Sequence, residues 1–397
     1  MSVCVIGAGI LGLATARELT RRHPGLAVTV VDKEQVVGAH QSGHNSCVVH
    51  AGLYYEPGSL KATLCRRGGG LLKEYCAEHG IAFDEIGKVV VAAEDAELPA
   101  LSRIADRATR NGVPDLRMVD AAGLKEIEPW SVGVAALHSP HTATVDFPAV
   151  CRRLADDVVE AGGDVLLGQE VTDVRETASG VEVTLPGGPR RFGSVVACAG
   201  LGSDRVARRV GSERDIRIVP FRGEYWRLTP PARDRVRGLI YPVPDPRYPF
   251  LGVHLTRRHD GEVLVGPNAV LALGREGYRW RDVDLGDLGE LARWPGMWRL
   301  ARRHWRTGVR ETTVSLSKRA FTKAARRYMP SLETDDLVRA EAGVRAQAVA
   351  RDGSLLDDFV VDVSGAVVAV RNAPSPAATS SLAIAEHIAD RVPVLHP

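Results

Sequence analysis

The clearest chemical signal in the sequence is a glycine-rich loop near its start. Gly7, Ala8, Gly9, Ile10, Leu11 and Gly12 follow the apolar run Val3–Ile6 and precede a helix-like pattern. Here Gly7 allows a tight turn, Gly9 lets the backbone approach a pyrophosphate, and Gly12 lets the helix pack on the strand. A second apolar run ends at Asp32, where a carboxylate can accept hydrogen bonds from a ribose. Strand, loop, helix, strand and acid in this order predict dinucleotide binding rather than a structural glycine turn.

A second group of polar side chains lies between residues 38 and 55. This stretch holds three histidines, two tyrosines and many small residues, a mixture that is unusual for an irregular surface loop. Small residues permit close approach to a flat ligand, while amide and hydroxyl groups can donate to phosphate or ring atoms. We therefore expect the stretch to line a cofactor, with Lys33, Gln41, Ser42, His44, Asn45 and Ser46 in contact with it.

Later strand ends supply further candidates for the cofactor site. The apolar run from 194 ends in Ala199 and Gly200, a second junction of strand and glycine at the depth of the sheet. Val171, Gly343 and Arg345 stand at comparable points of other runs. Pro376, Ala377, Ala378 and Thr379 are predicted to open the last helix, whose N-terminal amides can stabilise negative charge on a ligand.

Composition is that of an ordinary globular protein. The 397 residues are 45% apolar and 25% charged, and the net charge of +2 lacks the basic excess that nucleic-acid binding requires. The six cysteines form no C-x-x-C pair and show no metal-ligand spacing, so we expect neither disulfides nor a metal. With no apparent leader and no apolar run long enough to span a bilayer, we expect a cytoplasmic protein.

The pattern of elements divides the chain into two parts. A pattern of apolar runs and helices typical of a nucleotide-binding α/β fold occurs in residues 1–80, 147–215 and 335–397. Residues 81–146 and 216–334 contain alternating aromatic and proline-rich runs, which predict antiparallel strands. We therefore predict an α/β chain: a discontinuous Rossmann-like cofactor domain with an inserted, mainly antiparallel β substrate domain. Because the ends of the chain enclose the insertion, FAD fits better than a nicotinamide cofactor, whose fold closes within about 150 residues.

Longer motifs resemble one group of flavoproteins. They comprise residues 40–46, 49–62, 241–246, 250–257, 265–269, 343–347 and 372–379. Together they resemble the L-2-hydroxyglutarate oxidases and dehydrogenases, within the D-amino-acid-oxidase-like FAD oxidoreductases, and the resemblance covers the whole chain. One departure is Cys47, at a position where this family more often has glycine, so the surroundings of the flavin ring are expected to differ there.

The resemblance implies oxidation of L-2-hydroxyglutarate to 2-oxoglutarate, with hydride transfer to flavin N5. Imidazole suits proton transfer near neutral pH, which makes His50 and His254 the candidates for the base, His50 being favoured. Arg345 is the first candidate to bind a carboxylate, ahead of Arg222 and Arg257. Tyr54 and Tyr241 are candidates to hydrogen-bond the substrate. Each of these residues could instead be structural. Two other functions stay open: oxidation of another 2-hydroxy acid or an amine, as in a tailoring enzyme, and a non-catalytic flavoprotein.

One segment of the inserted part has an unusual composition. Residues 293–310 hold six arginines, three tryptophans and no acid. A helix over Met297–Arg306 would place Trp298, Ala301 and Trp305 on one face, flanked by arginines. Such a helix can lie at the surface of an anionic membrane and would suit an enzyme that passes electrons to a quinone rather than to oxygen. The alternative is a basic surface helix that packs its tryptophans into the protein's own core.

Overall fold

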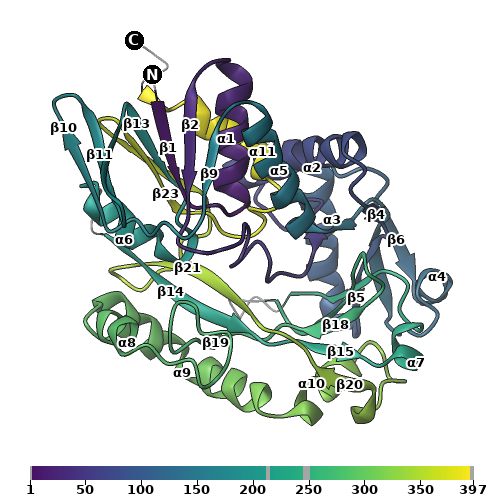
Figure 1. The fold of residues 1–397 in the computed structure, drawn as a ribbon. Helices are drawn as coiled ribbons and strands as arrows, with labels where there is room; N and C mark the ends of the chain where they lie inside the picture. Colours follow the sequence, from purple (N-terminus) through teal and green to yellow (C-terminus); the bar gives the residue numbers. More distant parts are fainter. Residues whose placement is uncertain (1, 212–214, 245–250, 394–397) are drawn as a thin grey trace.

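The computed structural model describes residues 2–211, 215–244 and 251–393. The motif positions 245, 246 and 250 lie outside these ranges. Two bodies of secondary structure stand one above the other in Figure 1, with the chain's start and last helix in the upper body. The glycine-rich loop belongs to the upper body, and the aromatic, proline-rich runs to the lower one.

The upper body is built on a six-stranded sheet. Its strands, in spatial order, are β22 (Val360–Ser364), β23 (Val367–Asn372), β13 (Ser194–Ala197), β1 (Ser2–Ile6), β2 (Ala27–Val31) and β9 (Asp164–Leu166). All neighbours are parallel except β22 and β23. The central strands are apolar and buried on both faces, as a parallel sheet covered on each side requires.

Two layers cover this sheet. One face packs against α1 (Ile10–Arg22), α2 (Leu60–Glu78), α5 (Phe147–Glu160) and α11 (Ser381–Ala389). The other packs against β10 (Asp173–Thr177), β11 (Gly180–Leu185), β12 (Gly188–Phe192) and α6 (Ser203–Arg209). Strands drawn from the start, middle and end of the chain share this sheet, so the Rossmann-like part is discontinuous, as predicted.

The lower body contains an eight-stranded sheet. Its spatial order is β20 (Leu337–Arg339), β15 (Trp226–Leu228), β18 (Val263–Gly266), β17 (His254–Arg257), β16 (Leu239–Pro242), β5 (Lys88–Ala92), β7 (Ala135–Ser139) and β6 (Arg117–Asp120). Only β16 and β5 run parallel, so the inserted sheet is mainly antiparallel, as predicted. Helix α10 (Lys318–Ala325) covers one face, and α3 (Leu98–Arg110) packs on part of the other. The short helices α4 (Ala121–Ile127) and α7 (Pro230–Arg233) lie at its ends.

A third sheet joins the two bodies. Strand β14 (Ile216–Gly223) pairs with β21 (Gly343–Ala350) along its whole length and with β19 (Val270–Leu271) at one end. Helices α8 (Leu285–Ala292) and α9 (Pro295–Ser315) pack on it from below. A small sheet of β3 (Val48–Val49), β8 (Ala143–Val145) and β4 (Phe83–Glu85) completes the junction. The exact limits of the two predicted domains stay a prediction.

Helix α6 follows a 3-10 turn at Gly200–Gly202, and β12 follows β11 at once and completes a meander with β10 and β11. One local prediction was wrong. Residues 376–379 do not open the last helix; they form a turn, and α11 begins at Ser381.

Candidate active site

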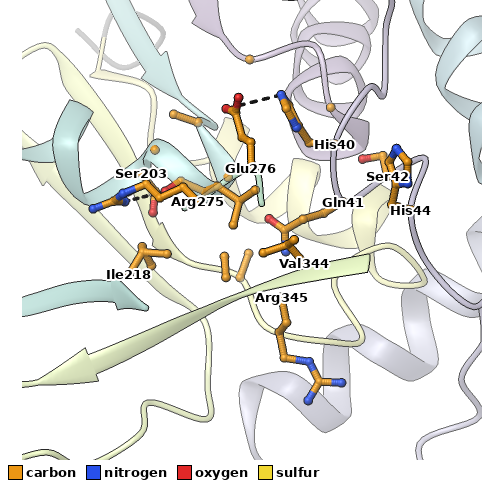
Figure 2. A pocket seen from close by; sticks show the side chains of 18 of the residues that line it. His40, Gln41, Ser42, His44, Ser203, Ile218, Arg275, Glu276, Val344 and Arg345 are labelled. Atoms are coloured by element: carbon orange, nitrogen blue, oxygen red, sulfur yellow. Dashed lines mark hydrogen bonds and ion pairs between the residues drawn. The ribbon is translucent and has the colours of Figure 1, made fainter. Parts of the chain in front are cut away.

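A deep cavity lies where the two bodies meet. Its volume is about 1140 Å³, and its walls come from the start of α1, the loop 39–50, the end of β13, β21 and the turn before α11. The predicted cofactor residues on these walls are Gly7, Gly9, Ile10, Leu11, Asp32, Lys33, Gln41, Ser42, His44, Asn45, Ser46, Val171, Ala199, Gly200, Gly343, Arg345, Pro376, Ala377, Ala378 and Thr379. Ala8 and Gly12 support the wall from behind. Figure 2 shows Gln41, Ser42, His44 and Arg345 arranged around this space.

The glycine loop has the geometry that its sequence predicts. Gly7 has a φ of 109°, and a Cβ there would lie 2.4 Å from the Cys198 carbonyl oxygen. A Cβ on Gly12 would lie 1.8 Å from the carbonyl oxygen of Gly7, so this glycine allows α1 to pack against the loop. A Cβ on Gly9 would meet only Ser42 Oγ, at 3.4 Å. Gly9 therefore keeps space open on the ligand side, whereas the other two maintain the fold.

Asp32 holds the loop in place through its carboxylate. Oδ2 accepts a hydrogen bond from the backbone amide of Ala8 at 2.6 Å, and Oδ1 accepts one from Glu34 at 2.9 Å. The side chain stands on the cavity wall at the end of β2, where a parallel sheet places a nucleotide's ribose. Its contact with a ribose stays a prediction.

At the outer rim of the cavity, residues 33–44 make polar and ring contacts with the segment 274–278, which the sequence analysis did not predict. His40 lies between Glu34, at 2.9 Å, and the hydroxyl of Tyr278, at 3.1 Å. The ring of Tyr278 also packs on His44, with centroids 4.4 Å apart, and Glu276 forms an ion pair with Lys33. The segment 274–278 is thereby fastened across the nucleotide side of the cavity (Figure 2).

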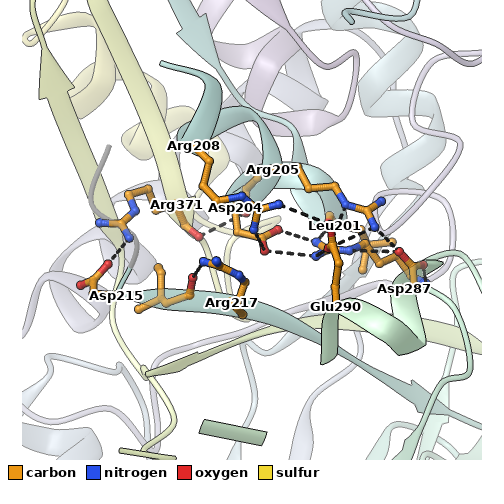
Figure 3. Close-up of polar contacts among 12 residues, drawn as sticks. Leu201, Asp204, Arg205, Arg208, Asp215, Arg217, Asp287, Glu290 and Arg371 are labelled. Carbon is orange, nitrogen blue, oxygen red and sulfur yellow. Dashed lines mark hydrogen bonds and ion pairs between the residues drawn. The ribbon is translucent and has the colours of Figure 1, made fainter. Parts of the chain in front are cut away.

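An ion-pair network anchors the same segment from below (Figure 3). Arg275 is buried and contacts Asp204 at 2.5 Å, Glu290 at 3.2 Å and Asp287 at 3.5 Å. Arg205 and Arg208, from α6, pair with the same three acids. Three arginines thus share three carboxylates, and the network joins α6 to α8.

His50 stands on the inner wall, beside the turn that precedes α11. Its backbone amide donates to Thr379 Oγ1 at 3.0 Å, and its carbonyl accepts the Cys65 thiol. Burial lowers the pKa of His50 well below 6.5, and the cationic side chains of Lys88, Lys61 and Arg345 lower it further. The imidazole is therefore neutral at physiological pH and can accept a proton.

His254 lies deeper, on the eight-stranded sheet. Its ring stacks on Tyr241 with centroids 3.9 Å apart, and Nδ1 is 2.8 Å from the Gly252 carbonyl, which fixes the ring. Burial lowers the pKa of His254 to about 3. The described residues that line the cavity do not include His254, Tyr241 or Tyr54, so these three candidates form a layer next to His50 rather than the cavity wall itself.

The three arginine candidates differ in their position relative to the cavity and in their partners. Arg345 is a lining residue of the cavity and points from β21 away from the rim residues His40 and Glu276 (Figure 2), and Tyr225 and Tyr55 lie in its electrostatic environment. Arg222 is buried, pairs with Glu224 at 3.3 Å and stacks on Trp280. Arg257 donates to the carbonyl of Val236 at 3.0 Å. Of the three, Arg345 alone has both the place and the orientation to receive a ligand carboxylate.

Comparison with known proteins agrees with this geometry. The family model described as FAD dependent oxidoreductase (DAO) matches residues 2–391. The chain belongs to this family. It is therefore an FAD-dependent oxidoreductase, an enzyme with FAD as its cofactor.

Within the FAD-dependent oxidoreductases, the chain groups with the L-2-hydroxyglutarate dehydrogenases. It is 48% identical to the mitochondrial L-2-hydroxyglutarate dehydrogenase of Nematostella vectensis, over 98% of this chain and 90% of that protein. Identity is 44% with the human mitochondrial enzyme, over 98% and 88%, and 41% with the enzyme of Escherichia coli K12, over 98% and 93%.

Solved structures show the same fold. The L-alpha-glycerophosphate oxidase of Mycoplasma pneumoniae, solved with FAD bound, matches with a TM-score of 0.79 at 22% identity, over 99% of this chain and 94% of that one. Glycine oxidase from Geobacillus kaustophilus matches with a TM-score of 0.71 at 19% identity, over 99% and 94%. These likenesses concern the fold alone. Across the described part of the chain, every helix is too short or too polar to cross a bilayer.

The cavity of this FAD oxidoreductase fits its cofactor. Helix α1 points its N-terminus at the cavity, and its N-cap, Gly9, has no side chain to block a pyrophosphate. FAD would lie along the wall residues named above, with the nucleotide towards Asp32 and the flavin towards His50. Cys47 has a φ of 62°, a left-handed backbone conformation that glycine adopts more readily than other residues. Its side chain is buried, and the described wall residues do not include it.

Proposed function

We propose that the protein oxidises L-2-hydroxyglutarate to 2-oxoglutarate. The observation that carries the proposal is a neutral imidazole, His50, surrounded by cationic side chains at the inner end of the FAD cavity. A site for a dicarboxylate needs positive charge, and a dehydrogenase needs a base for the hydroxyl proton. The names of the full-length relatives support the choice of substrate.

The residues suggest a division of labour. When bound, FAD would supply the acceptor for the carbinol hydrogen and its two bonding electrons, which would leave together as a hydride. His50 takes the hydroxyl proton, which its lowered pKa permits at neutral pH. The positive charge of Arg345 stabilises the negative charge that grows on the substrate oxygen as this proton leaves. Arg345 binds a carboxylate in a bidentate manner and so fixes the carbinol carbon between base and flavin.

Anaerobic mixing with L-2-hydroxyglutarate tests the proposal. We expect rapid loss of the visible flavin absorbance and stoichiometric formation of 2-oxoglutarate. Reduction by another 2-hydroxy acid or an amine, but not by L-2-hydroxyglutarate, would replace this substrate with a different one. If none of these compounds reduces the flavin, the protein is a non-catalytic flavoprotein.

We also propose that α9 places the enzyme on an anionic membrane surface, where a quinone rather than oxygen receives the electrons. The helix begins at Pro295 and ends at Ser315, longer than predicted, with a kink at His304. Trp294 is buried, but Trp298 and Trp305 are 64% and 59% exposed, so for these two the alternative of packing in the protein core is wrong.

The exposed apolar side chains of α9 share one face. Trp298, Trp305 and Val309 of α9, and Leu316 directly after its last residue, are spaced by seven, four and seven residues, which suits one side of a helix. Arg299, Arg302, Arg303, Arg306 and Arg310 flank them and are also exposed. The single acid of the helix, Glu311, is turned inward to the amide of Ala269. Rings at headgroup depth with flanking arginines match an anionic interface.

Co-sedimentation with vesicles tests the membrane proposal. The wild type should pellet with vesicles that contain phosphatidylglycerol, less so as salt rises, and should stay in solution with neutral vesicles. Replacing Trp298 and Trp305 with alanine should abolish pelleting without unfolding the protein. Trp130→Ala is the control, since Trp130 is also about half exposed, at 51%, but lies away from α9. A wild type that stays in the supernatant at low salt contradicts the proposal.

A further inference from the structure

Lys88, the first residue of β5, is a buried amine without a polar partner. The residue is 1% exposed, and among the described residues no hydrogen-bond acceptor lies within reach of Nζ. Its nearest aromatic neighbour is the ring of Tyr241, whose centroid is 4.0 Å from Nζ. A lysine is seldom buried without a partner, because removing an ammonium group from water is costly. A structural role would be met at lower cost by methionine or leucine.

The register of the sheet shows which way Lys88 points. On β5, β16 and β17, residues Val89, Ile240 and Leu255 belong to the apolar core beneath α10. Because successive residues alternate between faces, Lys88, Tyr241 and His254 share the opposite face, which looks towards the flavin-binding body. Thr256 pairs with Leu239, which in turn pairs with Lys88, and so lies on the same face.

Lys88 is part of the electrostatic surroundings of the candidate base. Of the charges that lower the pKa of His50, that of Lys88 has the largest effect, ahead of His254, Lys61 and Arg345. Lys61 is already paired with Asp357, at 2.7 Å. One further buried hydroxyl near Lys88, that of Tyr54, also has no hydrogen-bond partner in the described structure. Two neighbouring polar groups on this side of the site therefore lack partners.

We infer that Lys88 receives one of the two carboxylates of the substrate and thereby selects a dicarboxylate over a monocarboxylate. The inference rests on the proposed function, since it requires a dicarboxylic acid at this site. Arg345, on β21, lines the cavity together with His50, whereas Lys88 lies beside Tyr241 on the eight-stranded sheet, in the layer behind that wall, so the second carboxylate would reach it at the inner end of the site. Two cations on different elements near one base suit a ligand with an anion at each end.

Ligand binding should change the charge of this amine. Burial lowers the pKa of Lys88 to about 7. The groups that face it are Tyr54 from the loop, Cys65 from α2, Tyr241 and His254 from the sheet, and His50; all are neutral at that pH. Above pH 7 the empty site therefore holds the neutral amine, and an arriving carboxylate should draw a proton from solvent onto Nζ. Affinity for a dicarboxylate should fall as the pH rises above this value.

Calorimetry with two unreactive acids tests the inference in the holoenzyme. Glutarate and pentanoate have the same number of carbon atoms but differ by one carboxylate. Lys88→Met should weaken glutarate binding by on the order of 10- to 100-fold, the usual effect of losing one charged hydrogen-bonded contact, and should change pentanoate binding little. Titrations at pH 8 in buffers of different ionisation enthalpy should show proton uptake with glutarate in the wild type and none in the variant.

A matched variant and a second substitution keep the result interpretable. Lys61→Met removes another lysine whose charge acts on His50, but one that is already paired, so it should affect both acids slightly and equally. An equal loss of glutarate affinity in Lys61→Met and Lys88→Met would overturn the inference. So would Lys88→Met or Lys88→Gln proteins with bound FAD and unchanged glutarate affinity. If the wild type oxidises no dicarboxylic acid while Lys88 still governs glutarate binding, the proposed function fails rather than the carboxylate site.

Discussion

The two ends of the FAD cavity differ in how their buried charges are compensated. At the nucleotide end, Arg275 and the arginines of α6 share three carboxylates, and the buried members of this network are paired (Figure 3). At the inner end, cations surround two neutral histidines, and among the described residues no hydrogen-bond acceptor contacts the amine of Lys88. The first arrangement is complete in the protein alone, whereas the second is completed by a ligand.

This difference separates structural from functional charge. A buried ion pair costs desolvation energy that its partner offsets, so it can persist in any state of the enzyme. An isolated buried cation has no such offset and lowers its own pKa and those of its neighbours. The same field that destabilises a proton on His50 attracts an anionic substrate and keeps the imidazole unprotonated, the form that can accept the hydroxyl proton. The unfavourable free energy of burying cations at the inner end is therefore part of the proposed mechanism.

The largest predicted effect comes from Gly9, where the nucleotide end depends on the backbone. Gly9→Val should fold, because a Cβ there meets only Ser42 Oγ at 3.4 Å, but it should purify without FAD. Flavin absorbance per protein and the circular dichroism spectrum measure the two effects. Gly12→Ala is the contrast: its Cβ would lie 1.8 Å from a backbone oxygen, so the fold itself should be damaged. A yellow, fully loaded Gly9→Val protein would show that the pyrophosphate lies elsewhere.

His50→Ala is expected to have the next largest effect, at the inner end. FAD and glutarate should still bind, while flavin reduction by L-2-hydroxyglutarate should slow by on the order of 10² to 10⁴, the usual scale for a general base. Stopped-flow absorbance measures the rate. His254→Ala should have a smaller effect, because that ring lies behind the wall on Tyr241. The reverse order would transfer the base role to His254.

More of the nucleotide end than of the inner end could be predicted from the sequence. The glycine loop, Asp32 and the loop 41–46 are local signals, because their spacing alone fixes a turn, a helix start and an acid at a strand end. Lys88 carried no such signal: it stands in a short strand after Gly87, and only the pairing of β5 with β16 places it beside Tyr241. The ion-pair network was missed for the same reason, since the pairs that join α6 to residues 275–290 are more than 70 residues apart in the sequence. Contacts between segments that are far apart in the sequence produce no recognisable spacing of residues.

Breaking the paired end should affect stability rather than chemistry. Asp204→Ala leaves Arg275 buried with fewer acids, and the loss of a buried partner costs about 3–5 kcal/mol of unfolding free energy. Chemical denaturation of the holoenzyme measures this cost. Asp234→Ala, in an exposed pair with Arg233, is the control and should cost at most about 1 kcal/mol. If both variants are equally stable, the network at the nucleotide end is not the structural element that we describe.

The smallest predicted effect is the pH dependence of flavin reduction. This dependence follows the pKa of His50, which the electrostatic field at the inner end sets. The folded-state pKa of His50 lies well below its ordinary value of 6.5, because burial and neighbouring cations oppose the charged form. The base is therefore already neutral at pH 6.5, and the rate of reduction should stay level from pH 7.5 down through 6.5 and decline only at more acid pH. Stopped-flow reduction at saturating substrate measures this profile. Lys88→Met removes the strongest neighbouring charge, so it should raise the pKa of His50 and move the acid decline to higher pH. A wild-type decline centred at 6.5, unchanged by Lys88→Met, would mean that the inner end lacks the uncompensated positive field that distinguishes it from the nucleotide end.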